Sequence, residues 1–199
     1  MIRPLVLSLA LLALPTAAQE PRPDDRARLD QLDTAIGRAL RQVLAEGSEA
    51  DLAAATAALR GAALPAEQVT VEALAGDWQC RMTKIGGILP LVEYPPFRCR
   101  IELRDGVLHF DKLTGSQRSS GTLQILDGAW VYLGSTFVQG EAPLPYRDFP
   151  AELDTSAGET LPDAGLLEIT GPGRARLLLP LPYRESLLNV LTLTRQPRS

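Results

Sequence analysis

Reactive and metal-binding side chains are scarce in this chain of 199 residues, which contains two cysteines and one histidine, His109. There is no Cys-x-x-Cys spacing, so zinc would lack its usual set of ligands. The chain also lacks the Gly-x-Ser-x-Gly, His-Glu-x-x-His, phosphate-loop and dinucleotide-binding motifs. These absences argue against a metalloenzyme, a nucleotide-dependent enzyme and the common hydrolases. We therefore expect neither a bound metal nor a cofactor.

A hydrophobic run long enough to span a membrane is also absent. The apolar run from Leu5 to Leu14 covers about 10 residues, whereas a spanning helix needs about 20. It follows Arg3 and precedes Pro15-Thr16-Ala17-Ala18, which is the order of parts in a secretory signal peptide. We expect residues 1–18 to be removed by cleavage after Ala18, leaving a periplasmic protein with no transmembrane segment. No cysteine lies near the cut, which argues against a lipid anchor.

The charge balance argues against a nucleic-acid-binding protein. Removal of Arg3 leaves 19 of the 20 basic residues against 24 acidic ones, a net charge of −5. Residues 81–118 differ from the rest, because they carry 7 basic and 4 acidic residues. Their outer arginines are either ordinary solvated side chains or a basic patch for an acidic partner; these are Arg81, Arg98, Arg100 and Arg104.

The first part of the mature chain, residues 19–75, is predicted to be a polar leader followed by a helical hairpin. Apolar residues recur at helical spacing over residues 29–43, and this helix should end near Gly47. Ser48 and Asp51 resemble a capping box that starts a second, alanine-rich helix, which Gly61 ends.

From residue 76 to 199 the hydrophobic period changes to two, which predicts β-strands. The expected strands are residues 77–84, 97–104, 107–113, 119–126, 129–136, 165–170, 174–179 and 187–195. A run of eight strands without intervening helices indicates a barrel or a sandwich. Residues 140–162, rich in proline and glycine, are expected to form a long loop.

Two Asp-Gly turns set the register of the predicted hairpins. Turns at Asp105-Gly106 and Asp127-Gly128 give the inner pairs Leu103–Leu108, Ile101–Phe110, Cys99–Lys112, Ile125–Trp130 and Leu123–Tyr132, and the outer pairs Glu102–His109 and Arg100–Asp111. The outer pairs join opposite charges, which supports this register.

The two cysteines are predicted to form one disulfide. An even number of cysteines in an exported chain is typical of a disulfide. Cys80 shares its side of the strand with Trp78, and Cys99 shares its side with Ile101, so both point inward. Antiparallel pairing of their strands would bring them together.

The strand pattern resembles the lipocalin and avidin type of barrel. Gly76-Asp77-Trp78 opens the first strand, and Arg195 lies on the same side of the last strand as Leu191 and Leu193, as such a barrel requires. In that family a tryptophan at the barrel floor is covered by an arginine of the last strand, which implies structural roles for Trp78 and Arg195. The fold class we expect is mainly β: an antiparallel up-and-down barrel of about eight strands preceded by an α-helical hairpin.

A closer resemblance is to DUF4893, a domain-of-unknown-function family of exported bacterial proteins, over most of the mature chain. It rests on Gly76-Asp77-Trp78-Gln79-Cys80-Arg81, Lys84, Gly86-Gly87, Phe97-Arg98-Cys99-Arg100-Ile101, Phe110, Lys112-Leu113-Thr114-Gly115-Ser116-Gln117-Arg118, Ser120-Gly121, Tyr132-Leu133-Gly134 and Glu185-Ser186. The resemblance implies export and a single domain, and the family carries no assigned activity.

Candidate ligand-binding residues gather at one end of the predicted barrel. Lys84 and Lys112 share the inner side of their strands, away from the Asp105-Gly106 turn, and Arg118 follows in a turn rich in hydroxyl groups. Buried lysines are costly unless paired or hydrated, so an open, wet mouth is implied. Tyr132, on the inner face of the second hairpin, is a further candidate, and Glu185 is a candidate partner for a barrel lysine.

The same residues also allow simpler interpretations. In these, both lysines extend to solvent from strand ends, and residues 114–121 are only a connecting turn. His109 is expected to pair with Glu102 on the surface. A Ser-Lys arrangement using Ser119 or Ser120 with Lys112 is chemically allowed, but no spacing specifies it.

Three functions follow from these patterns. The first is a non-enzymatic exported barrel that binds a small or amphiphilic, anionic ligand through Lys84 and Lys112. The second is an envelope-associated module that contacts another protein through the helical hairpin or the outer arginines. The third is a hydrolase of unknown type, for which the sequence supplies no clear set of catalytic groups.

Overall fold

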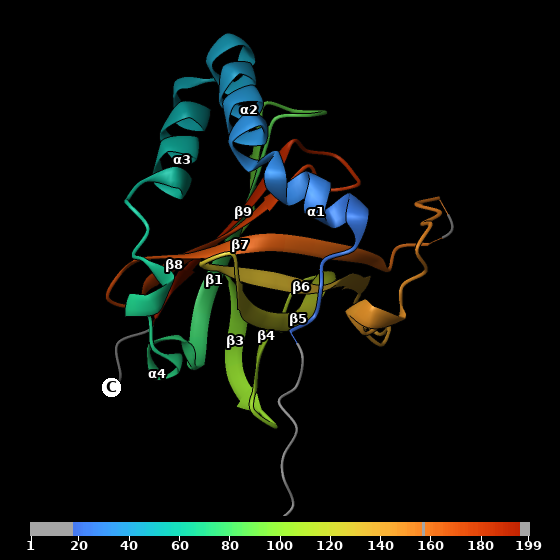
Figure 1. The fold of residues 1–199 in the computed structure, drawn as a ribbon. Coiled ribbons are helices and arrows are strands. Elements are labelled where there is room, and N and C mark those ends of the chain that lie inside the picture. Colours follow the sequence, from blue (N-terminus) through green and yellow to red (C-terminus); the bar gives the residue numbers. More distant parts are fainter. Residues whose placement is uncertain (1–17, 157, 196–199) are drawn as a thin grey trace, which may run out of the picture.

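The main body of the protein is a closed antiparallel β-barrel (Figure 1). The computed structural model describes residues 18–156 and 158–195, so the predicted signal peptide lies outside the described residues except for Ala18. The strands of this described part are β1 (Gly76–Ile85), β2 (Leu91–Glu93), β3 (Phe97–Arg104), β4 (Val107–Lys112), β5 (Gln117–Leu126), β6 (Ala129–Val138), β7 (Leu161–Gly171), β8 (Arg174–Pro180) and β9 (Leu188–Thr194).

The barrel closes because β1 pairs along one edge with β9 and along the other with β3. Every other barrel strand pairs with its neighbours in the chain, which confirms the predicted up-and-down order and the eight predicted strands. The short β2 was not predicted. It pairs with the second half of β1 and extends the line of β3 beyond Tyr94-Pro95-Pro96. Three residues are too few for alternation to be recognisable in the sequence.

Both predicted hairpin registers are confirmed, including the pairs Ile101–Phe110 and Leu123–Tyr132. The inner faces are apolar as expected, but Leu103 and Ile125 remain about half exposed. Leu103 lies beyond the last β1–β3 pair, at Ile101, and Ile125 lies beyond the last β4–β5 pair. These two side chains therefore have no neighbouring strand on one side to cover them.

The predicted disulfide between Cys80 and Cys99 is present. Cys99 is opposite Trp78 in the sheet and Cys80 is opposite Phe97, so the bond joins diagonal neighbours whose Cα atoms are 5.9 Å apart. Both cysteines are buried among the barrel core. The bond therefore ties β1 to β3 inside the barrel wall.

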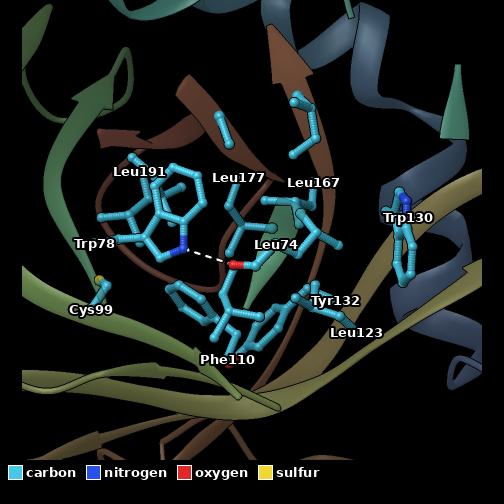
Figure 2. Close-up of a cluster of buried hydrophobic side chains, with 14 of the residues drawn as sticks. Leu74, Trp78, Cys99, Phe110, Leu123, Trp130, Tyr132, Leu167, Leu177 and Leu191 are labelled. Carbon is cyan, nitrogen blue, oxygen red and sulfur yellow. Dashed lines mark hydrogen bonds between the residues drawn. The ribbon is translucent and has the colours of Figure 1, made fainter. Parts of the chain in front are cut away.

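Bulky side chains fill the barrel between its floor and its middle (Figure 2). The rings of Phe110 and Tyr132 meet edge to face at 5.6 Å. At the floor, the indole N–H of Trp78 donates to the carbonyl oxygen of Leu74 at 2.9 Å. Leu74 ends the short helix α4 (Val71–Leu74), which follows the 3-10 turn η1 (Ala66–Gln68) and closes this end of the barrel. The lower part of the barrel is therefore filled and not hollow.

Arg195 completes the floor as the lipocalin-type resemblance implied. Its guanidinium lies 4.6 Å from the Trp78 ring and donates to the carbonyl oxygens of Ala73 and Ala75, both at 2.7 Å. Gly76, with φ +130°, makes room for this side chain, since a Cβ atom there would lie 3.2 Å from the guanidinium. The glycine of Gly76-Asp77-Trp78 is thus required by the arginine that covers the tryptophan.

The helices lie against the outside of the barrel (Figure 1). They are α1 (Pro23–Asp30), α2 (Leu32–Glu46) and α3 (Glu49–Leu59). The first predicted helix is in fact two, because Gln31 interrupts the helical conformation between α1 and α2. The Ser48–Asp51 capping box and the α2–α3 hairpin are confirmed. Ala39 and Val43 of α2 and Ala55 of α3 bury their side chains against outward residues of β8 and β9, including Leu178 and Val190.

Candidate functional site

A cavity of about 480 Å³ opens at the end of the barrel opposite the Asp105-Gly106 turn. Its size is within the range of small-molecule sites. Its apolar lining comes mainly from Met82, Tyr94, Phe97 and Val138, and its hydroxyl groups come from Ser116, Ser119 and Thr136. The floor and the middle of the barrel are packed, so this mouth is where the barrel holds open space.

Both lysines of the protein line this cavity. Of the 20 Lys and Arg residues in the chain, only Lys84 and Lys112 are lysines. The sequence-predicted candidates Lys84, Lys112 and Arg118 are therefore brought together at one mouth, as the strand register predicted. Lysine places a compact, strongly hydrated charge where arginine would place a broad planar one.

Lys112 is the most deeply buried cation of the cavity, with 6% of its surface exposed. Its ammonium donates to the carbonyl oxygens of Thr114, at 3.1 Å, and Gln117, and it lies 3.8 Å from the centre of the Phe97 ring. No carboxylate in the described part of the chain lies within ion-pair distance of it. Burial, followed by the charges of Arg118 and Lys84, lowers the pKa of Lys112 to about 8.

Arg118 reaches into the same turn as Lys112. Its guanidinium donates to the carbonyl oxygens of Gly115, at 2.6 Å, and Leu113. Gly115 has φ +94°, and a Cβ atom there would lie 2.8 Å from the Phe97 ring and 3.0 Å from the Lys112 ammonium. Residues 113–117 therefore wrap tightly around two cations and hold them with backbone oxygens, which carry only partial charges.

The other cation of the cavity is neutralised by a carboxylate. Lys84 forms an ion pair with Glu185 and lies 5.5 Å from the ring centre of Tyr94, which confirms that Glu185 partners a barrel lysine. Glu159, at the same rim, is bound by Arg184 at 2.6 Å. These carboxylates are already paired, so Lys112 and Arg118 leave the deeper part of the mouth electropositive.

The sequence did not indicate Asp163, which lies buried in the cavity wall. It lies opposite Gly134 of β6 in the sheet, and its side chain lies 3.7 Å from the guanidinium of Arg28 on α1. Burial raises the pKa of Asp163 to about 6, although Arg28 acts in the opposite direction. Because Arg28 comes from a helix 135 positions earlier in the chain, local sequence patterns carry no signal of this contact.

Arg28 belongs to a buried ionic cluster that fastens α1 to the barrel. It pairs with Asp25 at 2.8 Å and lies over the Tyr183 ring at 4.5 Å. Asp25 in turn accepts a hydrogen bond of 2.5 Å from Tyr146 in the 3-10 turn η2 (Tyr146–Asp148). The cluster thus links α1, the long loop before β7 and the loop before β9 at one side of the mouth.

Tyr132, the remaining ligand-binding candidate, is completely buried in the barrel core and is not part of the cavity lining. Its side chain lies over the opposed glycines Gly121 and Gly134. A Cβ atom at Gly121 would lie 2.6 Å from the ring, and one at Gly134 would lie 2.2 Å from the hydroxyl oxygen. Burial, then Asp163 and Asp111, raises the pKa of its hydroxyl. The observed surroundings of Tyr132 are those of a core residue.

Of the groups considered for catalysis, Ser119 and Lys112 both line the mouth cavity, whereas Ser120 and His109 do not. Ser120 donates to Asp111 at 2.6 Å on the outer face of the barrel, and Glu102 is opposite His109 there. Ser119 does line the cavity, opposite Lys112 in the sheet. In residues 18–156 and 158–195, no group of three or more His, Cys, Asp or Glu side chains is arranged to hold a metal ion.

The predicted basic patch on the outer face is largely neutralised. Arg81 pairs with Glu93, Arg100 pairs with Asp77, and Arg104 pairs with Glu102 and Asp111. The Arg98 side chain has no ion pair among the described residues. The helices of the described chain include none with the length and apolar character needed to cross a membrane.

The chain matches a model of a known protein family. The family model described as a domain of unknown function, DUF4893, matches residues 19–193. The chain belongs to the DUF4893 family. The matched range covers both the helices and the barrel of this chain. No curated protein and no solved structure matches the chain significantly.

Proposed function

We propose that this DUF4893 protein binds a small amphiphilic anion in the mouth of its barrel and has no catalytic role. The observation that carries the proposal is the pair Lys112 and Arg118, two buried or half-buried cations. Among the described residues, their charges are compensated only by carbonyl oxygens and an aromatic ring. A bound anion would supply the full negative charge that their surroundings lack. Charge-assisted hydrogen bonds to such an anion are stronger than those to neutral groups.

The apolar lining supports a ligand that is not only an anion. Met82, Phe97 and Val138 offer a surface for a hydrocarbon or aromatic portion, while Ser116 and Ser119 offer hydroxyl groups near the cations. The filled barrel below the mouth limits how deeply a ligand enters. A molecule with one anionic end and a compact apolar body fits these features better than a long acyl chain.

We also propose that the protein works outside the cytoplasm, after cleavage behind Ala18. The order of charged, apolar and small residues at the amino terminus supports this location. A buried Cys80–Cys99 disulfide suits an oxidising compartment. Amino-terminal sequencing of protein recovered from the periplasm tests it: Gln19 should be first, and recovery of an uncut chain in the cytoplasm would contradict the proposal.

The binding proposal is tested by native mass spectrometry of the protein purified from its own cells. A retained non-covalent mass that denaturation releases is the expected result. A Lys112→Gln and Arg118→Gln double variant should lose that mass. The matched control is Arg98→Gln with Arg147→Gln, which removes the same charge from exposed side chains elsewhere. A bare wild-type protein, or equal loss in both doubles, counts against the proposal.

Amine labelling gives a second readout because the chain has no lysine outside the cavity. Acetylation followed by peptide mapping should modify Lys84, Lys112 and the amino terminus. The amphiphilic anion anilinonaphthalene sulfonate should protect the two lysines and leave the amino terminus reactive. Equal labelling with and without this probe would show that the probe does not occupy the mouth.

A further inference from the structure

A second and larger hollow lies outside the barrel, between α3 and the outer faces of β1, β9 and β8. Its volume is about 780 Å³. The α3 residues that face it are small, including Ala53, Ala57 and Ala58, and they leave the space between helix and sheet unfilled. This basic groove is separate from the mouth cavity and shares none of its lining residues.

Arginines form the walls of the basic groove and threonines form its floor. Arg81 of β1 is opposite Thr192 of β9, which is opposite Arg176 of β8. Two residues further along the strands, on the same face, Thr194 is opposite Arg174. Since neighbouring strands lie about 4.8 Å apart, the Cα atoms of Arg81 and Arg176 are about 10 Å from each other across the groove.

The arginines of the groove differ in whether other groups of the protein already bind their guanidinium groups. Arg176 is an anchor, because it binds Glu168 at 2.6 Å and the carbonyl oxygens of Leu59 and Gly61 at the end of α3. Arg81 pairs with Glu93, the only acidic residue among the described residues that line the groove.

Arg60 and Arg174 are the free cations of the groove. Both are exposed, and neither side chain has an ion pair or hydrogen bond within the described residues. The chain as a whole carries a net charge of −4, so this concentration of guanidinium groups runs against its overall charge. The groove therefore presents unpaired positive charge beside exposed threonine hydroxyls.

We propose that the basic groove binds an extended acidic segment of a partner protein, with Arg60 and Arg174 as its main contacts. Alternate side chains of an extended peptide lie on one side and are about 7 Å apart, a spacing that long arginine side chains on opposite walls can reach. Guanidinium groups bind carboxylates with two parallel hydrogen bonds. Two free cations beside Glu93 are too few for a phosphate polymer, whose binding depends on many neutralised charges.

Fluorescence anisotropy with the purified wild-type protein and a labelled peptide of alternating glutamate and serine tests this inference. We expect saturable binding that weakens as salt is added. The Arg60→Gln, Arg174→Gln double variant should bind about tenfold more weakly, since each exposed ion pair contributes about 0.7 kcal/mol. The Arg98→Gln, Arg147→Gln double variant removes the same charge outside the groove and should bind like the wild type.

Three results would overturn the inference. These are no binding of the glutamate peptide at low salt, an equal loss of affinity in both double variants, and tighter binding of polyphosphate than of the peptide at the same charge. The mouth proposal is independent of all three, because Lys112 and Arg118 are unchanged in both variants. Since Arg60 and Arg174 support no other described side chain, loss of folding is not expected to obscure the result.

Discussion

The ammonium of Lys112 lies 3.8 Å from the centre of the Phe97 ring, inside a turn whose carbonyl oxygens accept hydrogen bonds from it. An aromatic face and carbonyl dipoles stabilise a cation, but less than a carboxylate does. Burial and the neighbouring cations Arg118 and Lys84 lower the pKa of Lys112 to about 8. The charge of the mouth cavity therefore changes within the range of ordinary buffers.

This relationship predicts that anion binding weakens as the pH rises through about 8. The affinity for anilinonaphthalene sulfonate, measured by fluorescence titration, should fall by about tenfold between pH 7 and pH 9.5 as Lys112 loses its proton. Lys112→Arg should remain charged and show no such fall. Lys112→Gln should bind weakly at both pH values, and a profile parallel to the wild type would exclude Lys112 as the titrating group.

The raised pKa of Asp163 predicts that the stability of the protein also depends on pH. Its pKa is raised to about 6, so folding favours the protonated carboxyl. The resulting stabilisation is absent well above pH 6 and grows as the pH falls below 6. Between pH 7 and pH 5 the free energy of unfolding of the wild type should rise by about 1 kcal/mol relative to Asp163→Asn. Urea unfolding at both pH values measures this. The same change in the free energy of unfolding in the wild type and in Asp163→Asn would refute the prediction.

The Cys80–Cys99 bond is expected to contribute measurably to stability. Replacing both cysteines with alanine should lower the free energy of unfolding by about 2–4 kcal/mol, because the bond restricts the unfolded chain over a separation of 19 residues. Urea unfolding of the oxidised wild type and the double variant gives the value. The reduced wild type is the control, and its free energy of unfolding should resemble that of the variant. If it resembles that of the oxidised protein instead, the bond does not contribute to stability.

The barrel floor supplies a further prediction. Arg195→Gln removes the contact with the Trp78 ring and the hydrogen bonds to Ala73 and Ala75, and should destabilise the protein by about 1–3 kcal/mol. Arg174→Gln, on the neighbouring strand, serves as the control and should leave thermal unfolding unchanged. An equally stable Arg195→Gln protein would show that these contacts of Arg195 do not stabilise the floor.

Local signals were enough to predict most of the barrel wall. Alternating hydrophobic residues located the eight barrel strands, and the Asp105-Gly106 and Asp127-Gly128 turns fixed which side of their own strands faces inward. The first turn placed Lys112 and Cys99 on the inner side, and alternation with Trp78 placed Lys84 and Cys80 on the inner side of the first strand. Each of these inferences needs only neighbours along one strand or across one tight turn.

Other features were decided by contacts between segments distant in the sequence. Asp163 became a cavity residue with a raised pKa because β7 is buried at the mouth, and α1 brings to it the guanidinium of Arg28, which opposes that rise. The basic groove exists because α3 lies across β1, β9 and β8 and gathers Arg60 and Arg174 from positions 114 residues apart. The sequence by itself determined which residues each strand turns inward, since side-chain alternation is a property of one strand. Only the tertiary structure decided which charges meet, because burial and pairing depend on how the helices lie against the closed barrel.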